Sequence, residues 1–325
     1  MKLPIVVLDS FTTSPLAIDE THPEHPSWHT LAALGDLTLH HRTSAEQLIE
    51  RVGKSPVIFT NKVVLSAETL QALPDLRYVG LMSTGTNVID LGVARDLGIT
   101  VTNVPAYSTA SVAQHTIALL LEMAGNVSAH AELAHSGKWS AQSDFSVRAG
   151  PMIELAGKKF GIVGCGDIGQ ATARIAVALG MEILVYSRSR RETDFPCRWM
   201  DKEEFLHSAD VVSLHCPLTP ETEEWINRTT LSQMKPGAFL INTGRGHLVD
   251  EQAVADALHS GHLGGYGADV TKEEPPSPNN PLFGVSGSLI TPHVAWANTE
   301  ARARLIATLA KNLEAFLNGN PQNVV

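Results

Sequence analysis

GIVGCGDIG, residues 161–169, decides the fold of this chain, because it places a Gly-x-Gly-x-x-Gly turn between a predicted strand and a predicted helix. Gly164 permits the tight turn, Gly166 lets the backbone approach a pyrophosphate, and Gly169 allows the helix and strand to pack closely. The helix N-terminus then offers unpaired N–H groups and a partial positive charge to the phosphates. The alternative is a glycine-rich turn without a ligand. The strand–turn–helix context favours a dinucleotide-binding turn.

Short β-branched runs alternate with segments of helical spacing on both sides of this turn. Such alternation implies right-handed crossovers and mostly parallel sheets. The predicted strands cover residues 5–9, 37–41, 57–60, 78–82 and 99–103 before the turn, and 159–164, 182–187, 211–215, 238–243, 265–270 and 288–293 from the turn onward. Because five strands precede the turn, we expect the chain to start in one α/β domain, cross into a second near residue 105, and return near residue 296 through a closing helix.

Composition limits the classes of function. The chain has 325 residues, enough for about two domains. Its net charge of −10 argues against a partner that is nucleic acid or an anionic membrane. Three cysteines without a CxxC pair argue against a disulfide framework or a zinc ribbon, so a cytoplasmic protein without a metal site is expected. The N-terminal run reads as a strand rather than a signal peptide, and no apolar stretch approaches a span of about 20 residues.

The segment after the second strand of the dinucleotide-binding region sets the predicted cofactor. An NAD site normally carries a carboxylate there, about 20 residues after the glycines, to hold the ribose hydroxyls. This chain instead has Ser187, Arg188, Ser189, Arg190 and Arg191. Guanidinium groups bind phosphate through their planar fork. The loop therefore favours NADP(H), with NAD(H) kept as the alternative; the other reading is a solvated basic loop.

Three polar residues follow late strands, where ligands gather in open α/β sheets: Arg245, Glu274 and His293. Each alone is a weak signal, because an isolated histidine after a strand is more often a packing or surface residue. Together they meet the needs of 2-oxo acid reduction. That reaction requires a cation for the carboxylate and carbonyl, a proton donor near the carbonyl oxygen, and a carboxylate that keeps this donor charged.

At this point the chain resembles the D-isomer-specific 2-hydroxyacid dehydrogenases over essentially its full length. The matching segments are NVPAYSTASVAQ (103–114), VGCGDIGQATA (163–173), HCPLT (215–219), MKPGAFLINTGRGHLVDE (234–251), GADVTKEEPP (267–276) and TPHVAWA (291–297). Within the family it looks most like the glycerate dehydrogenase/hydroxypyruvate reductase group, because of LMSTGTN (81–87) and the tryptophan in HVAW. The resemblance implies hydride transfer between NAD(P)H and hydroxypyruvate or glyoxylate, giving D-glycerate or glycolate.

The resemblance also implies an architecture. A smaller flavodoxin-like α/β substrate domain, residues 1–104 and 297–325, would flank a Rossmann-type doubly wound parallel sheet, residues 105–296. Region 120–150 would form the arm of a homodimer. Ser83, Thr84 and Gly85 would bind the substrate carboxylate together with Arg245. The expected cofactor contacts are Val112, Gly164, Gly166, Asp167, Ile168, Gly169, Ser187, Arg188, Arg190, His215, Cys216, Pro217, Thr222, Thr243, Gly244, Asp269, His293 and Ala295.

Alternatives remain at this stage. His115 is expected to be a packed core or interface histidine rather than a ligand, and for His215 a structural role and a cofactor contact are equally supported. Transcriptional corepressors resemble the same family, so a non-catalytic dinucleotide-sensing interaction protein is the rival function. The absence of long low-complexity extensions favours the enzyme. A methyltransferase would not explain Arg245, Glu274 and His293.

Overall fold

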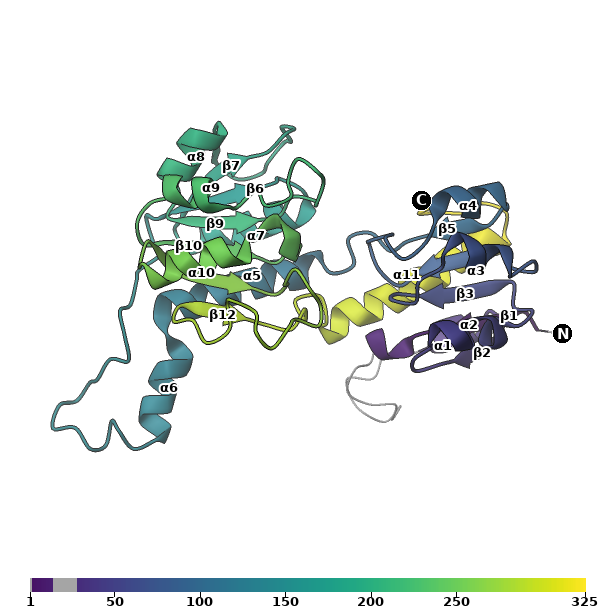
Figure 1. Ribbon diagram of the computed structural model, residues 1–325, viewed down its shortest axis with the longest axis horizontal. Coiled ribbons are helices and arrows are strands. Elements are labelled where there is room, and N and C mark those ends of the chain that lie inside the picture. Colours follow the sequence, from purple (N-terminus) through teal and green to yellow (C-terminus); the bar gives the residue numbers. More distant parts are fainter. Residues whose placement is uncertain (1, 14–27) are drawn as a thin grey trace. The chain divides into compact units, whose positions relative to one another are not determined.

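The computed structural model describes residues 2–13 and 28–325 and divides the chain into two compact units. Unit 1 comprises residues 1–108 and 297–325, and unit 2 comprises residues 109–296 (Figure 1). The chain therefore leaves unit 1 once and returns to it once. In the described part of the chain, no helix is both long and apolar enough to cross a membrane.

Unit 2 is built on one sheet of seven parallel strands, in the order β12-β11-β10-β9-β6-β7-β8. This order confirms the predicted Rossmann-type doubly wound sheet. The strands are β6 (Lys159–Val163), β7 (Glu182–Tyr186), β8 (Cys197–Trp199), β9 (Val211–Leu214), β10 (Ala238–Asn242), β11 (Leu263–Ala268) and β12 (Ser288–Ile290). The helices are α5 (Thr109–Gly125), α6 (Val127–His135), α7 (Asp167–Ala178), α8 (Lys202–Ser208), α9 (Arg228–Gln233) and α10 (Glu251–His259), with a 3₁₀ turn η2 (Gly246–Leu248).

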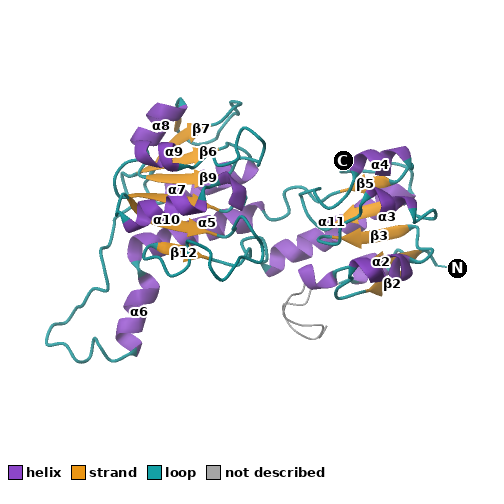
Figure 2. Cartoon of the chain, in the orientation of Figure 1, coloured by secondary structure: helices purple, strands orange, loops and turns teal. Residues whose placement is uncertain are grey.

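Helices cover both faces of this sheet (Figure 2). Helices α5 and α7 contribute Ile117, Leu120 and Ala173 to an apolar cluster with strand residues such as Phe160 and Ile162. Helices α8, α9 and α10 supply a second cluster on strand side chains that point the other way. Because side chains alternate along a strand, covering both faces explains why these strands read as continuous apolar runs.

Unit 1 has a smaller sheet of five parallel strands, in the order β2-β1-β3-β4-β5. This is the strand order of a flavodoxin-like fold and confirms the predicted fold class. The strands are β1 (Pro4–Val7), β2 (Asp36–Leu39), β3 (Val57–Thr60), β4 (Tyr78–Leu81) and β5 (Thr100–Thr102). The helices are α1 (His29–Ala32), α2 (Ala45–Val52), α3 (Ala67–Gln71), α4 (Leu91–Asp96) and α11 (Thr299–Leu317), with a 3₁₀ turn η1 (Ser10–Thr12).

Helix α11 completes the core of unit 1 although it lies at the far end of the sequence. Its Leu305, Leu309 and Leu313 are fully buried, and they cluster with Ile5 and Phe59 of the sheet. Helices α2, α3 and α4 cover the opposite face through a separate cluster. Fully burying one leucine stabilises the fold by about 1.5–3 kcal/mol, so this helix is a large part of the core of unit 1.

An arm leaves the body of unit 2 after α5. Helix α6 and the segment 136–154 extend away from the sheet (Figure 1), and none of the residues of α6 is buried. The arm exposes Trp139, Phe145 and Met152, with 92% of Phe145 accessible. Sequence periodicity did not predict α6 strongly, because a helix without a buried face needs no apolar stripe.

Candidate active site

The predicted site residues of unit 2 gather at one edge of its sheet. All seven strands are parallel, so their carboxyl ends lie at the same edge. The glycine turn follows β6, the basic loop follows β7, and His215 follows β9. Arg245 follows β10, Asp269 and Glu274 follow β11, and His293 follows β12. The strand order reverses between β6 and β9, the position where open α/β sheets bind ligands.

Each of the three positions in the turn favours glycine for a different physical reason. Gly164 has φ +97°, and a Cβ there would lie 2.8 Å from the backbone nitrogen of Cys216. A Cβ on Gly169 would lie 2.3 Å from the carbonyl oxygen of Gly164, so only glycine allows α7 to pack this closely. A Cβ on Gly166 would meet nothing within 4 Å. The backbone at Gly166, which directly precedes Asp167 and Ile168 of α7, therefore faces open space, as a pyrophosphate site requires.

The loop after β7 carries only hydroxyl and guanidinium groups over residues 187–191. Arg188 and Arg190 are exposed, and the Arg190 guanidinium lies 5.9 Å from the centre of the Trp199 ring. Arg191 forms an ion pair with Asp167 on the first turn of α7, with 3.6 Å between Nη1 and Oδ1. This pair joins the basic loop to the glycine turn. Hydroxyl and guanidinium groups of this kind can donate hydrogen bonds to the phosphate groups of a dinucleotide.

His215 packs behind the glycine turn. Its Nε2 lies 3.0 Å from the Ser213 hydroxyl, and burial lowers the pKa of the imidazole to about 4. The ring is therefore neutral at pH 7. Beyond Cys216, the Thr222 hydroxyl donates to the carbonyl of Pro217 at 2.7 Å and closes a turn over residues 217–222.

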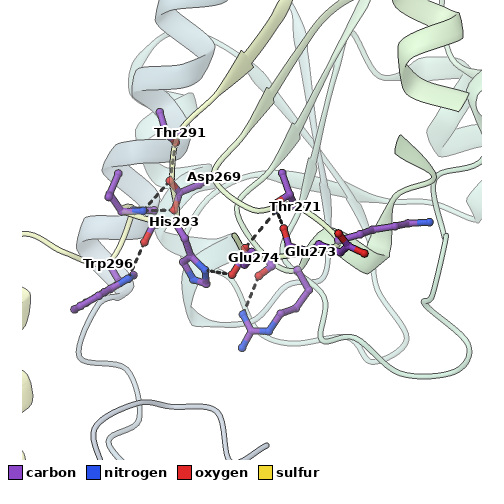
Figure 3. Close-up of polar contacts among 12 residues, drawn as sticks. Asp269, Thr271, Glu273, Glu274, Thr291, His293 and Trp296 are labelled. Carbon is purple, nitrogen blue, oxygen red and sulfur yellow. Dashed lines mark hydrogen bonds and ion pairs between the residues drawn. The ribbon is translucent and has the colours of Figure 1, made fainter. Parts of the chain in front are cut away.

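A histidine–carboxylate pair lies at the carboxyl edge of the sheet of unit 2 (Figure 3). His293 Nδ1 lies 2.6 Å from Glu274 Oε2, and each side chain is 34% exposed. The other carboxylate oxygen of Glu274 accepts from the backbone N–H of Thr271 at 3.3 Å. Because a carboxylate can only accept, His293 Nδ1 carries the proton and the imidazole Nε2 faces away from Glu274. The predicted pairing of Glu274 with His293 is present in the structure.

Asp269 holds the backbone on both sides of His293. Its buried carboxylate accepts from the Thr291 hydroxyl at 2.6 Å and from the backbone N–H groups of Val294 and Ala295 at 2.9 and 2.7 Å. His293 has φ +56°, a left-handed conformation that is uncommon for residues other than glycine. Asp269 therefore fixes the backbone that follows His293. Ala295, one of its partners, is buried.

Arg245 stands on a loop that is fixed from below. Asn242, the fully buried last residue of β10, donates from Nδ2 to the carbonyl of Arg245 at 2.9 Å and accepts from the N–H of Gly244 at 3.1 Å. A Cβ on Gly246 would lie 2.0 Å from the carbonyl carbon of Thr271. The Arg245 loop thus lies directly against the loop that carries Glu274, while the Arg245 side chain is exposed.

Helix α5 contributes to the same edge. The Thr116 hydroxyl lies 2.9 Å from that of Thr243 and donates to the carbonyl of Val112, which is largely buried. His115 was expected to be a packed core or interface histidine. Its Nε2 lies 2.9 Å from the Thr291 hydroxyl and 3.6 Å from Asp269 Oδ1.

The predicted substrate loop lies in unit 1, directly after β4. Ser83, Thr84 and Gly85 follow a fully buried strand, and the loop carries three successive backbone N–H groups. In residues 2–13 and 28–325, none of these N–H groups has a hydrogen-bond partner. Successive unpaired N–H groups form a concave site for an anion. In the same described ranges, no group of three or more His, Cys, Asp or Glu side chains is arranged to hold a metal ion.

Three supporting residues were not predicted from the sequence. They are Asn242, Thr291 and Glu251. Glu251 is buried at the start of α10 and accepts from the N–H of Lys272 and the amide of Asn280, both at 2.9 Å. A polar residue at the end of an apolar strand was the available signal for Asn242. Nothing local distinguishes Glu251 from an ordinary first-turn glutamate.

Comparison with known proteins gives a family match to unit 2. The family described as "D-isomer specific 2-hydroxyacid dehydrogenase, NAD binding domain" matches residues 117–295. This range contains β6 to β12 together with the glycine turn, Arg245, Glu274 and His293. The unit therefore carries a nicotinamide dinucleotide-binding domain.

Full-length relatives match both units. A hydroxypyruvate reductase of Blautia hydrogenotrophica is 43% identical over 326 residues, covering 99% of each chain. A glycerate dehydrogenase of Methylorubrum extorquens is 39% identical over 282 residues, covering 86% of this chain and 88% of that protein. Among solved structures, an acyclic imino acid reductase in complex with NADPH and D-Arg is 29% identical, with a TM-score of 0.84 over 99% of both chains.

Proposed function

We propose that this chain, which belongs to the D-isomer-specific 2-hydroxyacid dehydrogenase family, uses its His293–Glu274 pair to reduce hydroxypyruvate to D-glycerate, with glyoxylate as a second substrate. The bound nicotinamide supplies the hydride. The observation that carries the proposal is the 2.6 Å contact between His293 and Glu274, beside the Arg245 loop at the carboxyl edge of the sheet. The names of the relatives support the choice of substrate.

His293 is the proton donor in this proposal. Glu274 accepts from Nδ1, so it fixes the orientation of the ring. Nε2 then gives its proton to the carbonyl oxygen as the hydride reaches the carbonyl carbon. In the reverse direction the neutral ring takes the hydroxyl proton.

Arg245 and the substrate loop bind the acid group of the substrate. The exposed guanidinium of Arg245 offers paired N–H donors in a planar fork. The unpaired N–H groups of Ser83, Thr84 and Gly85 supply further donors from unit 1. A substrate carboxylate bound by Arg245 would present its neighbouring carbonyl to His293.

NADP(H) is the proposed cofactor. The turn at Gly164, Gly166 and Gly169 holds the pyrophosphate, and Arg188 and Arg190 bind the 2′-phosphate. The support is the absence of any carboxylate among residues 187–191, together with the NADPH in the related imino acid reductase structure.

The arm supports a proposed homodimer in the cytoplasm. Trp139, Phe145 and Met152 expose apolar surface on a segment that leaves the body of unit 2. A second copy is the partner that would cover it. The cysteines of the described chain are free thiols, in keeping with a reducing compartment.

The direct test is loss of NADPH absorbance with purified protein and a panel of hydroxypyruvate, glyoxylate, pyruvate and 2-oxoglutarate. The expected result is highest kcat/KM for hydroxypyruvate, then glyoxylate. A preference for 2-oxoglutarate or pyruvate would contradict the proposed substrate, and no turnover with any 2-oxo acid would contradict the proposed reaction. Parallel assays with NADH report the cofactor preference.

A further inference from the structure

Asp9 is a buried acid in unit 1 that the proposed chemistry does not use. It lies two residues after the end of β1, and only 1% of its surface is exposed. Its two carboxyl oxygens accept from the backbone N–H of Asn61, at 3.0 and 3.1 Å, and one of them accepts from the N–H of Lys62 at 2.5 Å. Both oxygens therefore face donors on the loop that follows β3.

This loop is connected to the substrate loop. The buried side chain of Asn61 donates from Nδ2 to the carbonyl of Met82 at 3.0 Å. The N–H of Met82 donates in turn to the carbonyl of Thr60 at 2.8 Å. Met82 immediately precedes Ser83, so Asn61 fixes the backbone at the point where the three unpaired N–H groups begin.

The segment after β5 holds the other side of the same loop. The N–H of Val104 donates to the carbonyl of Ser83 at 3.0 Å, and Asn103 Nδ2 donates to the carbonyl of Thr84 at 2.8 Å. These bonds turn the carbonyls of the loop toward β5. The direction in which its N–H groups point therefore depends on two anchors, and the Asp9–Asn61 connection is the anchor on the β3 side.

We propose that Asp9 is a positioning residue for substrate binding, which acts through Asn61 on the Ser83–Gly85 loop. This inference rests on the proposed function, because it assumes that the loop binds the substrate carboxylate. Asp9 touches neither substrate nor cofactor. Its carboxyl group holds residues 61 and 62 so that the Asn61 side chain meets the carbonyl of Met82. Hydrogen bonds from three or more N–H groups aimed at one anion lose strength together when the loop shifts.

The test is Asp9→Asn. This change keeps the size of the side chain but turns one of the two acceptors into a donor, which then faces backbone N–H groups. KM for hydroxypyruvate is expected to rise about tenfold while kcat changes by less than about twofold, because uniform binding is lost. KM for NADPH is expected to stay unchanged, since the proposed cofactor contacts lie in unit 2.

Ser55→Ala is the matched control. Ser55 is buried at the opposite end of β3, and its hydroxyl donates to the carbonyls of Val57 at 2.8 Å and Pro4 at 3.0 Å. Its loss removes buried hydrogen bonds from the same strands without reaching the substrate loop. Thermal unfolding is expected to shift in both variants, and KM for hydroxypyruvate only in Asp9→Asn. An equal rise of KM in the control would show a merely structural role and overturn the assignment.

Asn61→Ala supplies the second variant. It removes the contact with Met82 but leaves Asp9 and the N–H donors in place, so it decides the question if Asp9→Asn fails to fold. KM should rise in the same way, and the double variant should be less than additive because both changes break one connection. Unchanged KM in a folded variant, with active wild-type enzyme, overturns the assignment alone. A wild-type chain without hydroxypyruvate turnover overturns the proposed function, and this assignment with it.

Discussion

The imidazole of His293 combines three constraints. Its Nδ1 meets Glu274, its carbonyl accepts from the indole N–H of Trp296 at 2.9 Å, and the backbone beyond it is tied to Asp269. A left-handed φ at a residue other than glycine persists only where the surroundings enforce it, and such positions concentrate at functional sites. The backbone conformation and the side-chain contacts therefore both indicate that His293 is a functional residue.

His293→Ala is expected to lower kcat for hydroxypyruvate by about 10²–10⁴-fold, the usual contribution of a general acid. The dissociation constant of NADPH, measured by fluorescence titration, should change little. His207→Ala, which alters an exposed histidine on α8, is the control and should keep full activity. Retained turnover in His293→Ala would assign the proton transfer to another group.

His215 predicts a pH dependence of stability. Burial lowers its pKa from the ordinary 6.5 to about 4, so below pH 6.5 the unfolded chain binds a proton that the folded protein does not. This contribution to stability is present above pH 6.5 and is lost as the pH falls toward 4. In His215→Gln the unfolding midpoint should therefore fall less steeply between pH 6.5 and 4 than in the wild type. Parallel curves for the two proteins would contradict this account.

At the scale of elements, hydrogen bonds join helix α10 to the loop that follows β11. Glu251 accepts from Lys272 N–H and from Asn280, and the Lys272 side chain reaches Glu224 at 2.6 Å. These contacts frame the loop that carries Glu274. A carboxylate at the start of a helix is common, but the oxygens of Glu251 accept hydrogen bonds from the loop after β11.

Glu251→Gln is expected to lower kcat about tenfold and also to lower the melting temperature. The new amide group would place an N–H donor opposite a group that itself donates, so one buried hydrogen bond would be lost. Glu203→Gln on α8 is the matched control, since it changes an exposed first-turn glutamate. A drop in melting temperature with unchanged kcat would show that the loop keeps Glu274 in place without Glu251.

We propose that the loop after β7 sets the preference for NADPH over NADH. Well-formed charge-assisted hydrogen bonds contribute roughly 1.5–3 kcal/mol each, and exposure of Arg188 reduces this by solvent screening. We expect about a tenfold to hundredfold preference for NADPH. Ser187→Asp combined with Arg188→Ala should reverse it, as measured by kcat/KM for each cofactor at fixed hydroxypyruvate. A wild-type enzyme that prefers NADH would contradict the proposed role of this loop.

For the whole molecule, alternation of strands and helices was enough to predict two parallel α/β sheets. The glycine turn located one of them, and the chemistry of 2-oxo acid reduction suggested that Glu274 and His293 act together. Glu251 and Asp9 escaped prediction for a physical reason. Glu251 accepts from the backbone N–H of Lys272, and Asp9 accepts from that of Asn61. Because these partners are distant in sequence, no short motif with a fixed spacing marks either acid.

The return of the chain to unit 1 has a consequence for its synthesis. The apolar face of the first sheet is complete only when Leu305, Leu309 and Leu313 of α11 reach it. Translation from residue 108 to residue 297 takes roughly 10–40 s at about 5–20 residues per second. During that time the ribosome displays an unfinished core, whereas unit 2, a continuous segment, emerges whole. The part of the protein made first is therefore the last to mature, and its open face is the surface that a nascent-chain chaperone would meet.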